Sequence, residues 1–545
     1  MNTTNPSAGV YVNERDLSQR IAAASTTIGA IVGISGKGPV MQRTLVTSTK
    51  QFLSIFGPPT PQTSFMHYCA LQFLTESSRL YVTRVENGAL TAGAYLSVDD
   101  LTSPRPVLKL TNFDDGTNQP LGKYDPFNTL EFDPEAPGIE RVLGFFCAEN
   151  PGTWNNDIFV RVRPSNKPGV ADPDNPLLFH VDVFLNYTSR RQAPDESFLV
   201  CRDYYVDGFG EQLQIEEVIN RRSQIIRYRA NPYAPIEVKV LNTATEFLDG
   251  ASNGDRPTEA QVVRAWELYR DPEQLDVNIL IQGGYDSVAV QQTMTDIAED
   301  RMDSVAVLDL PHGVNQVADA IYFRRNDLNI DSSYAALYGP DLSVYDEYND
   351  LQLFIPPSGH AAAAYARTDN VAETWFAPAG LNRGMLRIQG VREVYNLGDR
   401  DALAEAQVNC VRVIPGIGYA IWGADTLQTM ASALSNVNVR RLMNFMETSI
   451  KLAALYQVFE PGDEILWARL TEMCERFLKP IKAGRGLYWF GVQCDEKNNP
   501  PELQQLGDTA LDIFVDPVIP AKRIHLNATV NRRGARFTST VIDTP

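Results

Sequence analysis

The chain has 545 residues and carries 48 Lys and Arg against 67 Asp and Glu, a formal net charge of −19. A hydrophobic content of 44% and a charged content of 21% are ordinary for globular proteins and exclude global disorder. The negative charge argues against contact with a nucleic-acid backbone or an anionic membrane surface, because both require clustered Lys and Arg. At about 150 residues per domain, the length predicts three or four domains.

Residues 1–20 are polar and have no core of their own. They lack the basic and apolar regions of a signal peptide, and none of the six cysteines of the chain has C-x-x-C spacing. We therefore expect free thiols in a protein made in a reducing cytosol. Val10, Tyr11 and Val12 predict a short strand, so the segment is either a disordered tail or an arm that pairs elsewhere.

Residues 21–90 show the pattern of α/β structure, and the same pattern returns after about residue 246. Capping-box spacings, which are typical of helix starts, occur at Ser48–Gln51 and Thr258–Gln261. A strand–helix–strand pattern runs from Val277 to Leu310. A unit of this size predicts two parallel strands joined by a right-handed crossover.

Residues 91–245 differ from the segments on either side. Pro, Asn, Asp and Gly are frequent, and short apolar runs such as Ile158–Val162 and Leu177–Leu185 predict strands. Helical periodicity is nearly confined to Glu211–Asn220. This composition predicts a mostly β insertion that is the most exposed part of the protein.

The last third of the chain is predicted to hold two long helices and a final run of strands. An apolar stripe follows Val439–Val458, and Asp463 begins the second helix, which ends near Gly484. Strands are then predicted at Leu487–Cys494 and Ala510–Val515.

The two ends of the chain share one property. In Arg523–Val530 apolar and polar residues alternate, which predicts a strand with one buried face, and the tail beyond it has no core of its own. An unpaired strand with an apolar face is a template for pairing with another chain, whereas the alternative is two frayed ends. The residues we expect to pair between subunits are Val10, Tyr11, Val12, Ile524, Leu526, Phe537 and Val541.

The second predicted helix ends in a basic patch formed by Arg476, Lys479, Lys482 and Arg485. In a chain of negative net charge, this patch could face an acidic partner. Basic residues near the carboxyl end of a helix also suit its dipole, so the alternative is a purely local role.

Two segments invite an enzymatic interpretation, and both are weak. Gly33–Gly38 resembles a phosphate loop, but it lacks the Ser or Thr after the lysine and no amphipathic helix follows it. Ser358 and His360 could belong to a hydrolase triad, but Ser358 or the adjoining Gly-His is better explained as the N-cap of the Ala-rich helix that follows. The histidines and acidic clusters lack metal-ligand spacing, so no metal or cofactor is expected.

Segments spread along the chain resemble the contractile phage (myovirus) tail sheath proteins. The resemblance starts with Pro6–Glu14, Ile28–Pro39, Leu45–Pro58 and Ala148–Asp157. The strongest part lies downstream, in the order of the family, at Ser333–Tyr338, Pro356–His360, Ala366–Asp369, Ala377–Gly380, Asn409–Pro415, Ile421–Gly423, Val437–Leu442, Phe459–Pro461, Leu466–Trp467, Gln493–Asp495 and Asn498–Asn499. One departure is Ala424–Leu427, where the family commonly has an Arg before Thr-Leu.

The resemblance implies a multidomain α/β and α+β fold that is structural and not enzymatic. It implies discontinuous inner and middle α/β domains, a mostly β outer insertion and extended terminal arms. The implied parts are an arm at 1–20, a middle domain of 21–90 with 246–390, an outer insertion at 91–245, an inner core at 391–530 that also takes in the first arm, and an arm at 531–545.

The resemblance also implies a function. Subunits would stack as six-fold rings around a tail tube, contact baseplate and tail terminator proteins, and assemble in the host cytoplasm into the virion tail. Contraction would drive the tube through the host envelope during genome delivery, with no nucleotide, and the basic patch would face the tube. The alternatives are the sheath of a bacteriocin or secretion system and, much further away, a hydrolase or nucleotide-binding enzyme.

Overall fold

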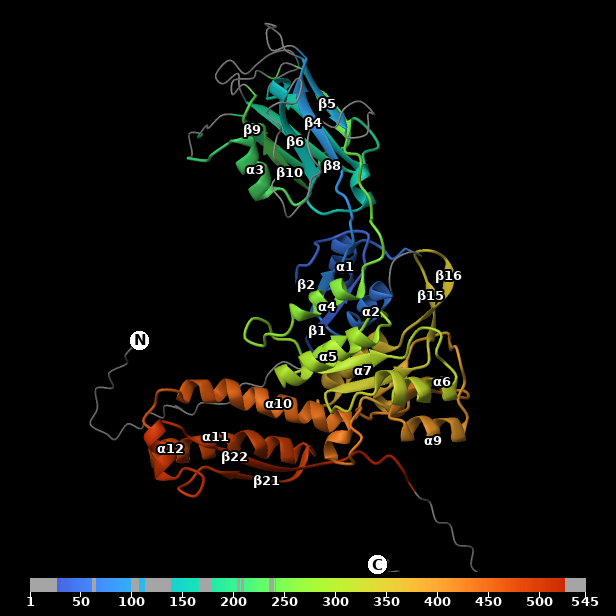
Figure 1. The fold of residues 1–545 in the computed structure, drawn as a ribbon, viewed down its shortest axis with the longest axis vertical. Helices are drawn as coiled ribbons and strands as arrows, with labels where there is room; N and C mark the ends of the chain where they lie inside the picture. The colour runs from blue at the N-terminus through green and yellow to red at the C-terminus, as the bar shows by residue number, and fades with distance from the viewer. Residues whose placement is uncertain are drawn as a thin grey trace, which may run out of the picture.

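The computed structural model describes residues 27–60, 65–99, 107–112, 139–165, 178–202, 206, 210–234, 240 and 242–524. Figure 1 shows three parts along the long axis: a β-rich part at one end, an α/β part in the middle, and a layer of two long helices over two strands at the other end. The predictions for both terminal arms lie outside the described residues, including those for Val10, Tyr11, Val12, Leu526, Phe537 and Val541.

The middle part is built on a nine-stranded sheet in the order β17-β20-β19-β14-β13-β12-β1-β3-β2. The six strands from β19 to β3 are parallel to their neighbours, and β2, β20 and β17 are antiparallel at the edges. Their bounds are β1 Gly29–Gly33, β2 Thr44–Val46, β3 Leu80–Arg84, β12 Ile279–Ile281, β13 Val305–Asp309, β14 Ala335–Gly339, β17 Met385–Leu386, β19 Val408–Ile414 and β20 Gly418–Ile421.

Helices cover both faces of this sheet. In β1, Ala30 and Val32 enter one buried cluster and Ile31 enters the other, because alternate residues of a strand point to opposite faces. The first face carries α4 (Glu259–Glu267), α5 (Val288–Arg301), α6 (Val317–Tyr322), the π-helical turn η3 (Phe323–Leu328) and α9 (Leu397–Glu405). The second carries α1 (Thr49–Phe56), α2 (Met66–Phe73) and α7 (Ser358–Val371). A sheet buried on both faces explains the continuous apolar strands.

The local helix signals are largely confirmed. Thr258 caps α4 with both bonds of the capping box, and the predicted parallel pair on either side of α5 is present as β12 and β13. Ser48 caps α1, but the Gln51 side chain accepts from the amide of Thr47 and not from that of Ser48. Only half of that predicted capping box therefore forms.

Strands are the main regular structure in the described parts of 91–245. Two four-stranded antiparallel sheets enclose one apolar core. One sheet has β10 (Ile226–Ala230), β6 (Val142–Ala148), β4 (Gly93–Val98) and β5 (Leu108–Asn112), and the other has β11 (Ala244–Phe247), β7 (Ile158–Pro164), β8 (Phe179–Leu185) and β9 (Glu196–Val200). The helix α3 (Ile215–Arg222) packs beside them, and short helical turns lie at η1 (Ile139–Arg141) and η2 (Thr153–Asp157).

The last part is a helical layer on a two-stranded sheet, followed along the chain in orange and red in Figure 1. Its elements are α10 (Val437–Ala454), η5 (Leu455–Gln457), α11 (Glu464–Ala483), β21 (Leu487–Gln493), α12 (Pro501–Leu506) and β22 (Asp512–Pro517). Asp463 caps α11 as predicted, with its side chain accepting from two amides of the first turn. The first of the two long helices is expected to start at Val439, but α10 begins two residues earlier, at Val437. Val437 and Arg440 in its first turn are buried against the middle part.

The remaining described elements lie on the middle part. The strands β16 (Leu351–Ile355), β15 (Leu342–Asp346) and β18 (Gly390–Val391) form a small antiparallel sheet. Short helices lie at α8 (Gly380–Arg383) and η4 (Ala433–Ser435). Among the described residues, no helix is both long and apolar enough to cross a bilayer.

The large sheet does not end at the expected boundary between residues 390 and 391. Strand β19, beyond that boundary, pairs in parallel with β14, and β20 extends the same sheet. The apolar strand β19 is buried beside β14, so the sheet continues through β19 and β20 to the edge strand β17. The separate helical layer starts only at α10.

Candidate subunit-interaction surfaces

The sheet of β21 and β22 is incomplete by itself. The two strands pair over Leu487–Gln493 and Asp512–Pro517, and within the described residues no third strand pairs with either outer edge. Two-stranded ribbons are at best marginally stable in water, and an unpaired edge presents a row of free N–H and C=O groups. Both edges can therefore accept an added strand.

The two faces of this sheet differ. Phe490 and Val515 pack onto the buried residues of α10 and α11, whereas Trp489 and Phe514 on the other face are each more than half exposed. The Trp489 ring lies over Gly491, where an added Cβ would approach it to 2.7 Å. The outer face is thus apolar and is left uncovered by the described part of the chain, as expected of a surface that is covered on assembly.

Only one of the residues predicted to pair between subunits is described. Ile524 is 88% exposed and is not in a strand. Just before it, Lys522 forms an ion pair with Asp425, which fixes where the chain leaves the last strand. The predicted strand at Arg523–Val530 is absent at its first two residues, and the rest lies outside the described part.

The predicted basic patch at the end of α11 is smaller than its sequence indicates. Arg476 pairs with Glu472 at 2.6 Å, and Lys479 pairs with Glu475 at 2.9 Å, both one turn earlier on the same helix. Two of the four basic side chains therefore already have a carboxylate partner within the helix. The signal was present in the sequence as acidic residues four positions earlier.

Two cations of the patch remain available. Lys482 lies 5.8 Å from the centre of the Phe490 ring, and Arg485 has a left-handed backbone with φ of 66°. Among the described residues, neither lies within 4.0 Å of a carboxylate. An acidic partner would meet these two side chains first.

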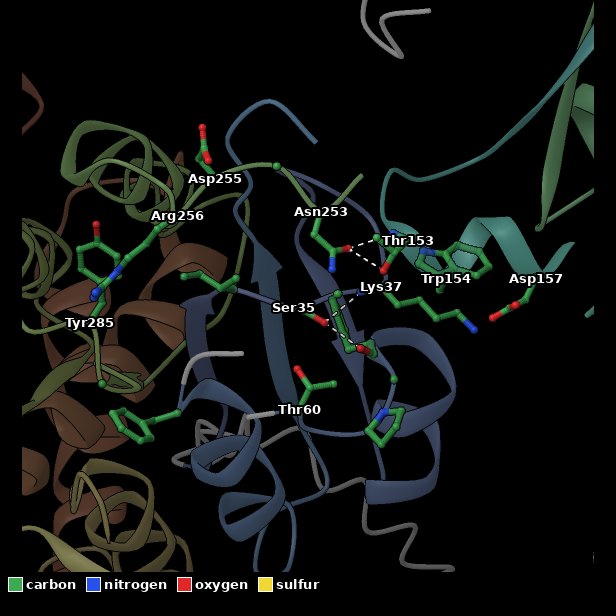
Figure 2. Close-up of a pocket in the computed structure, with 18 residues that line it drawn as sticks. Ser35, Lys37, Thr60, Thr153, Trp154, Asp157, Asn253, Asp255, Arg256 and Tyr285 are labelled. Carbon is green, nitrogen blue, oxygen red and sulfur yellow. Dashed lines mark hydrogen bonds between the residues drawn. The ribbon is translucent and has the colours of Figure 1, made fainter. Parts of the chain in front are cut away.

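A cavity of about 660 Å³ lies between the middle part and the β-rich part. Figure 2 shows Ser35 and Lys37, which follow β1, facing Trp154, with Tyr285 from the loop after β12 on the other side. The strands β1 and β12 are adjacent and parallel, and the strands that follow them, β3 and β13, lie on opposite sides of this pair. The cavity therefore lies at a switch point of the sheet, where α/β proteins commonly bind ligands. It is the place to look for enzyme chemistry.

The cavity does not hold an activated serine. The Ser35 hydroxyl donates to the carbonyl of Phe56 at 2.7 Å, and its distance to His67 Nε2 is 3.5 Å. Burial lowers the pKa of His67 to about 4, and within the described residues its Nδ1 has no partner to orient the ring. A hydrolytic base needs a pKa nearer the working pH and an orienting group.

The phosphate-loop interpretation of Gly33–Gly38 has no support in the geometry. The loop leads through Thr44 into β2 and not into a helix, so there is no helix N-terminus to hold a phosphate. Lys37 instead stacks on Trp154, with 4.7 Å between its Nζ and the ring centre.

Ser358 and His360 do not form a triad either. Both are buried in α7, and burial lowers the pKa of His360 to about 4. The predicted capping by Ser358 is wrong, because the helix begins at Ser358 after Pro357 and no side chain of its own caps it. The Ser358 amide instead donates to the buried Asp309 at 2.6 Å, so a carboxyl from β13 performs the capping.

The motif around Ala148–Asp157 forms the joint between the β-rich part and the middle part. Arg84, buried, donates to the carbonyls of Gly38 at 2.8 Å and Pro151 at 2.7 Å. Gly152 has φ of 136°, and a Cβ there would lie 2.3 Å from the carbonyl oxygen of Gly36. The backbones touch, so only glycine fits and the joint is tight.

A second joint fixes the helical layer to the middle part. The Asn444 amide on α10 donates to the carbonyl of Ser304 at 3.0 Å, and Asn438 donates to that of Trp375 at 3.0 Å. The indole of Trp375 in turn donates to the carbonyl of Gly484 at 2.9 Å. Sequence reasoning assigned no role to these residues, although Asn438 lies inside one of the segments that resemble sheath proteins.

Comparison with known proteins shows which proteins this chain resembles. The family model of the phage tail sheath protein central domain matches residues 257–427. The tail sheath protein of Enterobacteria phage T4 is 29% identical to this chain, over 97% of the chain and 98% of the relative. The chain is therefore similar to phage tail sheath proteins over nearly its whole length, and the sheath central domain matches its middle.

Solved structures agree at the level of the fold. The sheath tail protein from Listeria innocua superposes with a TM-score of 0.58 at 10% identity, over 92% of this chain and 94% of that one. The helical sheath of the anti-feeding prophage in its contracted state gives 0.52 at 14% identity, over 96% and 98%. The mixed α/β multidomain architecture is therefore that of sheath proteins.

Proposed function

We propose that this protein is the structural subunit of a contractile tail sheath. It polymerises helically around the tail tube and contracts to drive the tube through the host envelope during genome delivery. The observation that carries the proposal is the similarity to the T4 tail sheath protein along 97% of the chain. The open two-stranded sheet of β21 and β22 supports it independently, because the described residues of one subunit leave its apolar face and both strand edges uncovered.

Assembly works by exchange of strands. Residues 1–20 of one copy and 531–545 of another extend the β21–β22 sheet of a neighbour through main-chain hydrogen bonds. Val10, Tyr11 and Val12, together with Ile524, Leu526, Phe537 and Val541, supply the apolar side chains that set the register. The exposed faces of Trp489 and Phe514 support this assignment, because an added strand could carry side chains that cover them.

Contraction moves each subunit largely as a rigid body, with the arms as hinges. The backbone contact of Gly152 with Gly36 and the bonds of Asn444 and Trp375 support this, since they tie the three described parts together. The free energy comes from a change in packing between subunits, so the subunit is not an enzyme and needs no nucleotide.

The proposed partners follow from this role. Copies form six-fold stacked rings, and the basic end of α11 faces the tail tube, with Lys482 and Arg485 as its available charges. Baseplate and tail terminator proteins cap the two ends of the sheath. Assembly takes place in the host cytoplasm, and the product is part of the virion tail.

The second candidate is the sheath of a bacteriocin or another contractile injection machine. The fold shared with the anti-feeding prophage sheath favours keeping it. The genes that neighbour the coding sequence separate the two, since capsid and packaging genes accompany only a phage. The contacts of Ser35, Lys37 and Ser358 do not support the alternative of a hydrolase or a nucleotide-binding enzyme.

Negative-stain electron microscopy of the purified full chain tests the proposal. We expect sheath-like tubes to appear as the protein is concentrated. A protein that stays monomeric at every concentration, with and without tail tubes, would refute the sheath function.

A further inference from the structure

The turn between α10 and α11 exposes an unusual amount of apolar surface. We call residues 455–465 the apolar tip. Five of its side chains are more than half exposed, namely Leu455, Tyr456, Val458, Phe459 and Ile465. Contiguous apolar patches on a protein surface mark sites of interaction.

The apolar tip is anchored to α11, and its backbone is strained at the most exposed residue. The buried Gln457 accepts from Arg469 Nη1 at 3.3 Å, which anchors the turn to α11. Phe459 has φ of 71°, in the left-handed region, while its ring is fully solvated. A bulky residue in this conformation costs free energy that no contact of the ring within the described chain offsets, and strain of this kind clusters at functional sites.

The charge on the apolar tip restricts what can cover it. Residues 455–465 contain Glu460, Asp463 and Glu464 and no Lys or Arg. Arg469 of α11 lies 3.8 Å from Glu460 and offsets one of these charges, so the tip keeps a net negative charge. Two such tips would repel each other, so a symmetric contact between tips is disfavoured. The complementary surface has to be both apolar and cationic.

The described chain carries a surface of that kind at the edge of its large sheet. Arg412 of β19 stacks on the exposed Trp422, with 4.4 Å between the guanidinium carbon and the ring centre. Arg387, directly after β17, and Ile417 in the β19–β20 turn are also exposed. We call these four residues the cationic edge.

The arginines of the cationic edge are unpaired within the described residues. Neither Arg387 nor Arg412 lies within 4.0 Å of a carboxylate there, in a chain of net charge −19. Arg and Trp are both enriched in interaction hot spots, and a guanidinium matches the geometry of a carboxylate.

We propose that the apolar tip of one copy docks on the cationic edge of the next copy in the sheath. This rests on the proposed sheath function, but it is a contact between folded surfaces and does not involve the terminal arms. In Figure 1 the α10–α11 turn lies at the left of the helical layer, and α9, which leads into β19, lies at the lower right. A contact between two different surfaces repeats from copy to copy and builds an open helical assembly.

Phe459→Gly tests the apolar tip. Glycine accepts the φ of 71° without strain, so the variant monomer keeps or gains stability, while the critical concentration for tube formation rises about tenfold or more, as for loss of an aromatic hot spot. The matched control is Met302→Gly, since Met302 is also exposed at φ of 60° but lies at the end of α5. The control should assemble as the unchanged protein does.

A charge exchange tests the partner surface. Glu460→Arg with Glu464→Arg, or Arg387→Glu with Arg412→Glu, should each impair tube formation, and the chain carrying all four should recover most of it. If the unchanged protein forms no tubes, the sheath function itself fails. If it forms tubes but Phe459→Gly assembles equally well, or the fourfold variant is no better than either pair, the docking proposal is overturned and the tip contacts another partner.

Discussion

Arg441 on α10 donates to Asp369 on α7 at 2.6 Å, with side chains only 4% and 7% exposed. The guanidinium also lies 4.9 Å from the centre of the Tyr365 ring. Both partners fall inside segments that carry the resemblance to sheath proteins, Ala366–Asp369 and Val437–Leu442. The pair links the helical layer to the middle part and brings these two distant segments into contact.

Breaking this pair should destabilise the subunit strongly. Asp369→Ala leaves a buried guanidinium without its carboxylate, and we expect a loss of about 3–5 kcal/mol in the free energy of unfolding. Glu475→Ala, which removes the exposed partner of Lys479, is the control and should cost less than about 1 kcal/mol. Urea unfolding of the monomer measures both, and equal small losses would show that Arg441 does not hold the two parts together.

The sequence predicted elements best where the signal is local. The capping residues Thr258 and Asp463 mark helix starts that the structure confirms. Paired side chains one turn apart, such as Glu475 with Lys479, could also have been read from spacing alone.

Relationships across the fold could not be predicted in this way. The parallel pairing of β19 with β14 extends the sheet past residue 390. Strand pairing depends on which apolar strands are buried together in the fold, and distance along the sequence does not determine it. Capping of α7 by Asp309 joins residues 49 positions apart. The joint at Gly152 depends on a backbone contact that leaves only an isolated glycine as its trace in the sequence.

Asp309 should make stability depend on pH in an unusual direction. Burial, followed by the nearby charge of Asp341, raises the pKa of Asp309 from 3.8 to about 8, although hydrogen bonds from Ser358 oppose the shift. The folded state therefore holds this proton more tightly than the unfolded state. The contribution to the free energy of unfolding is fully present below the unfolded pKa and is lost as the pH rises toward 8.

Asp309→Asn isolates this effect. Asparagine keeps an oxygen that can accept from the Ser358 amide and cannot ionise, so its stability relative to the unchanged protein should improve steadily from about pH 4 to about pH 8. Buried His67 and His360, whose pKa values are lowered to about 4, act in the opposite direction but cancel in the comparison. Thermal unfolding across this range measures the difference, and a difference that stays constant with pH would contradict a raised pKa.

Asp182→Asn provides the opposite case. Burial alone would raise the pKa of Asp182, but hydrogen bonds from Arg163, Ser197 and Arg161 outweigh it and lower the pKa. The native charge is stabilising above the unfolded pKa, so this substitution should destabilise the protein at neutral pH. The loss should diminish as the pH falls through the folded pKa.

Removal of either terminal arm should separate folding from assembly. Chains lacking residues 1–20 or 531–545 should remain soluble, folded monomers, because the described cores do not include those residues. They should fail to form tubes, since the β21–β22 sheet of the neighbour stays open. Circular dichroism checks the fold and electron microscopy the tubes, and normal tubes from both truncated chains would overturn strand exchange.

Charge reversal at the end of α11 tests the contact with the tail tube. Reversing Lys479, Lys482 and Arg485 together should weaken assembly on the tube more than self-assembly into contracted tubes. Because Lys479 is already paired with Glu475, most of the effect should come from Lys482→Glu with Arg485→Glu. Lys479→Glu alone is the matched control, with a local cost of about 0.2–0.5 kcal/mol from like charges one turn apart.

The two assembly reactions make this prediction decisive. Sedimentation of the variants with isolated tail tubes, and without them, gives the two yields for each protein. A larger loss on the tube for the Lys482 and Arg485 variant than for the Lys479 control places the tube contact at the end of the helix. Equal losses in both reactions would remove the tube from this surface and leave the basic residues as partners of the helix dipole.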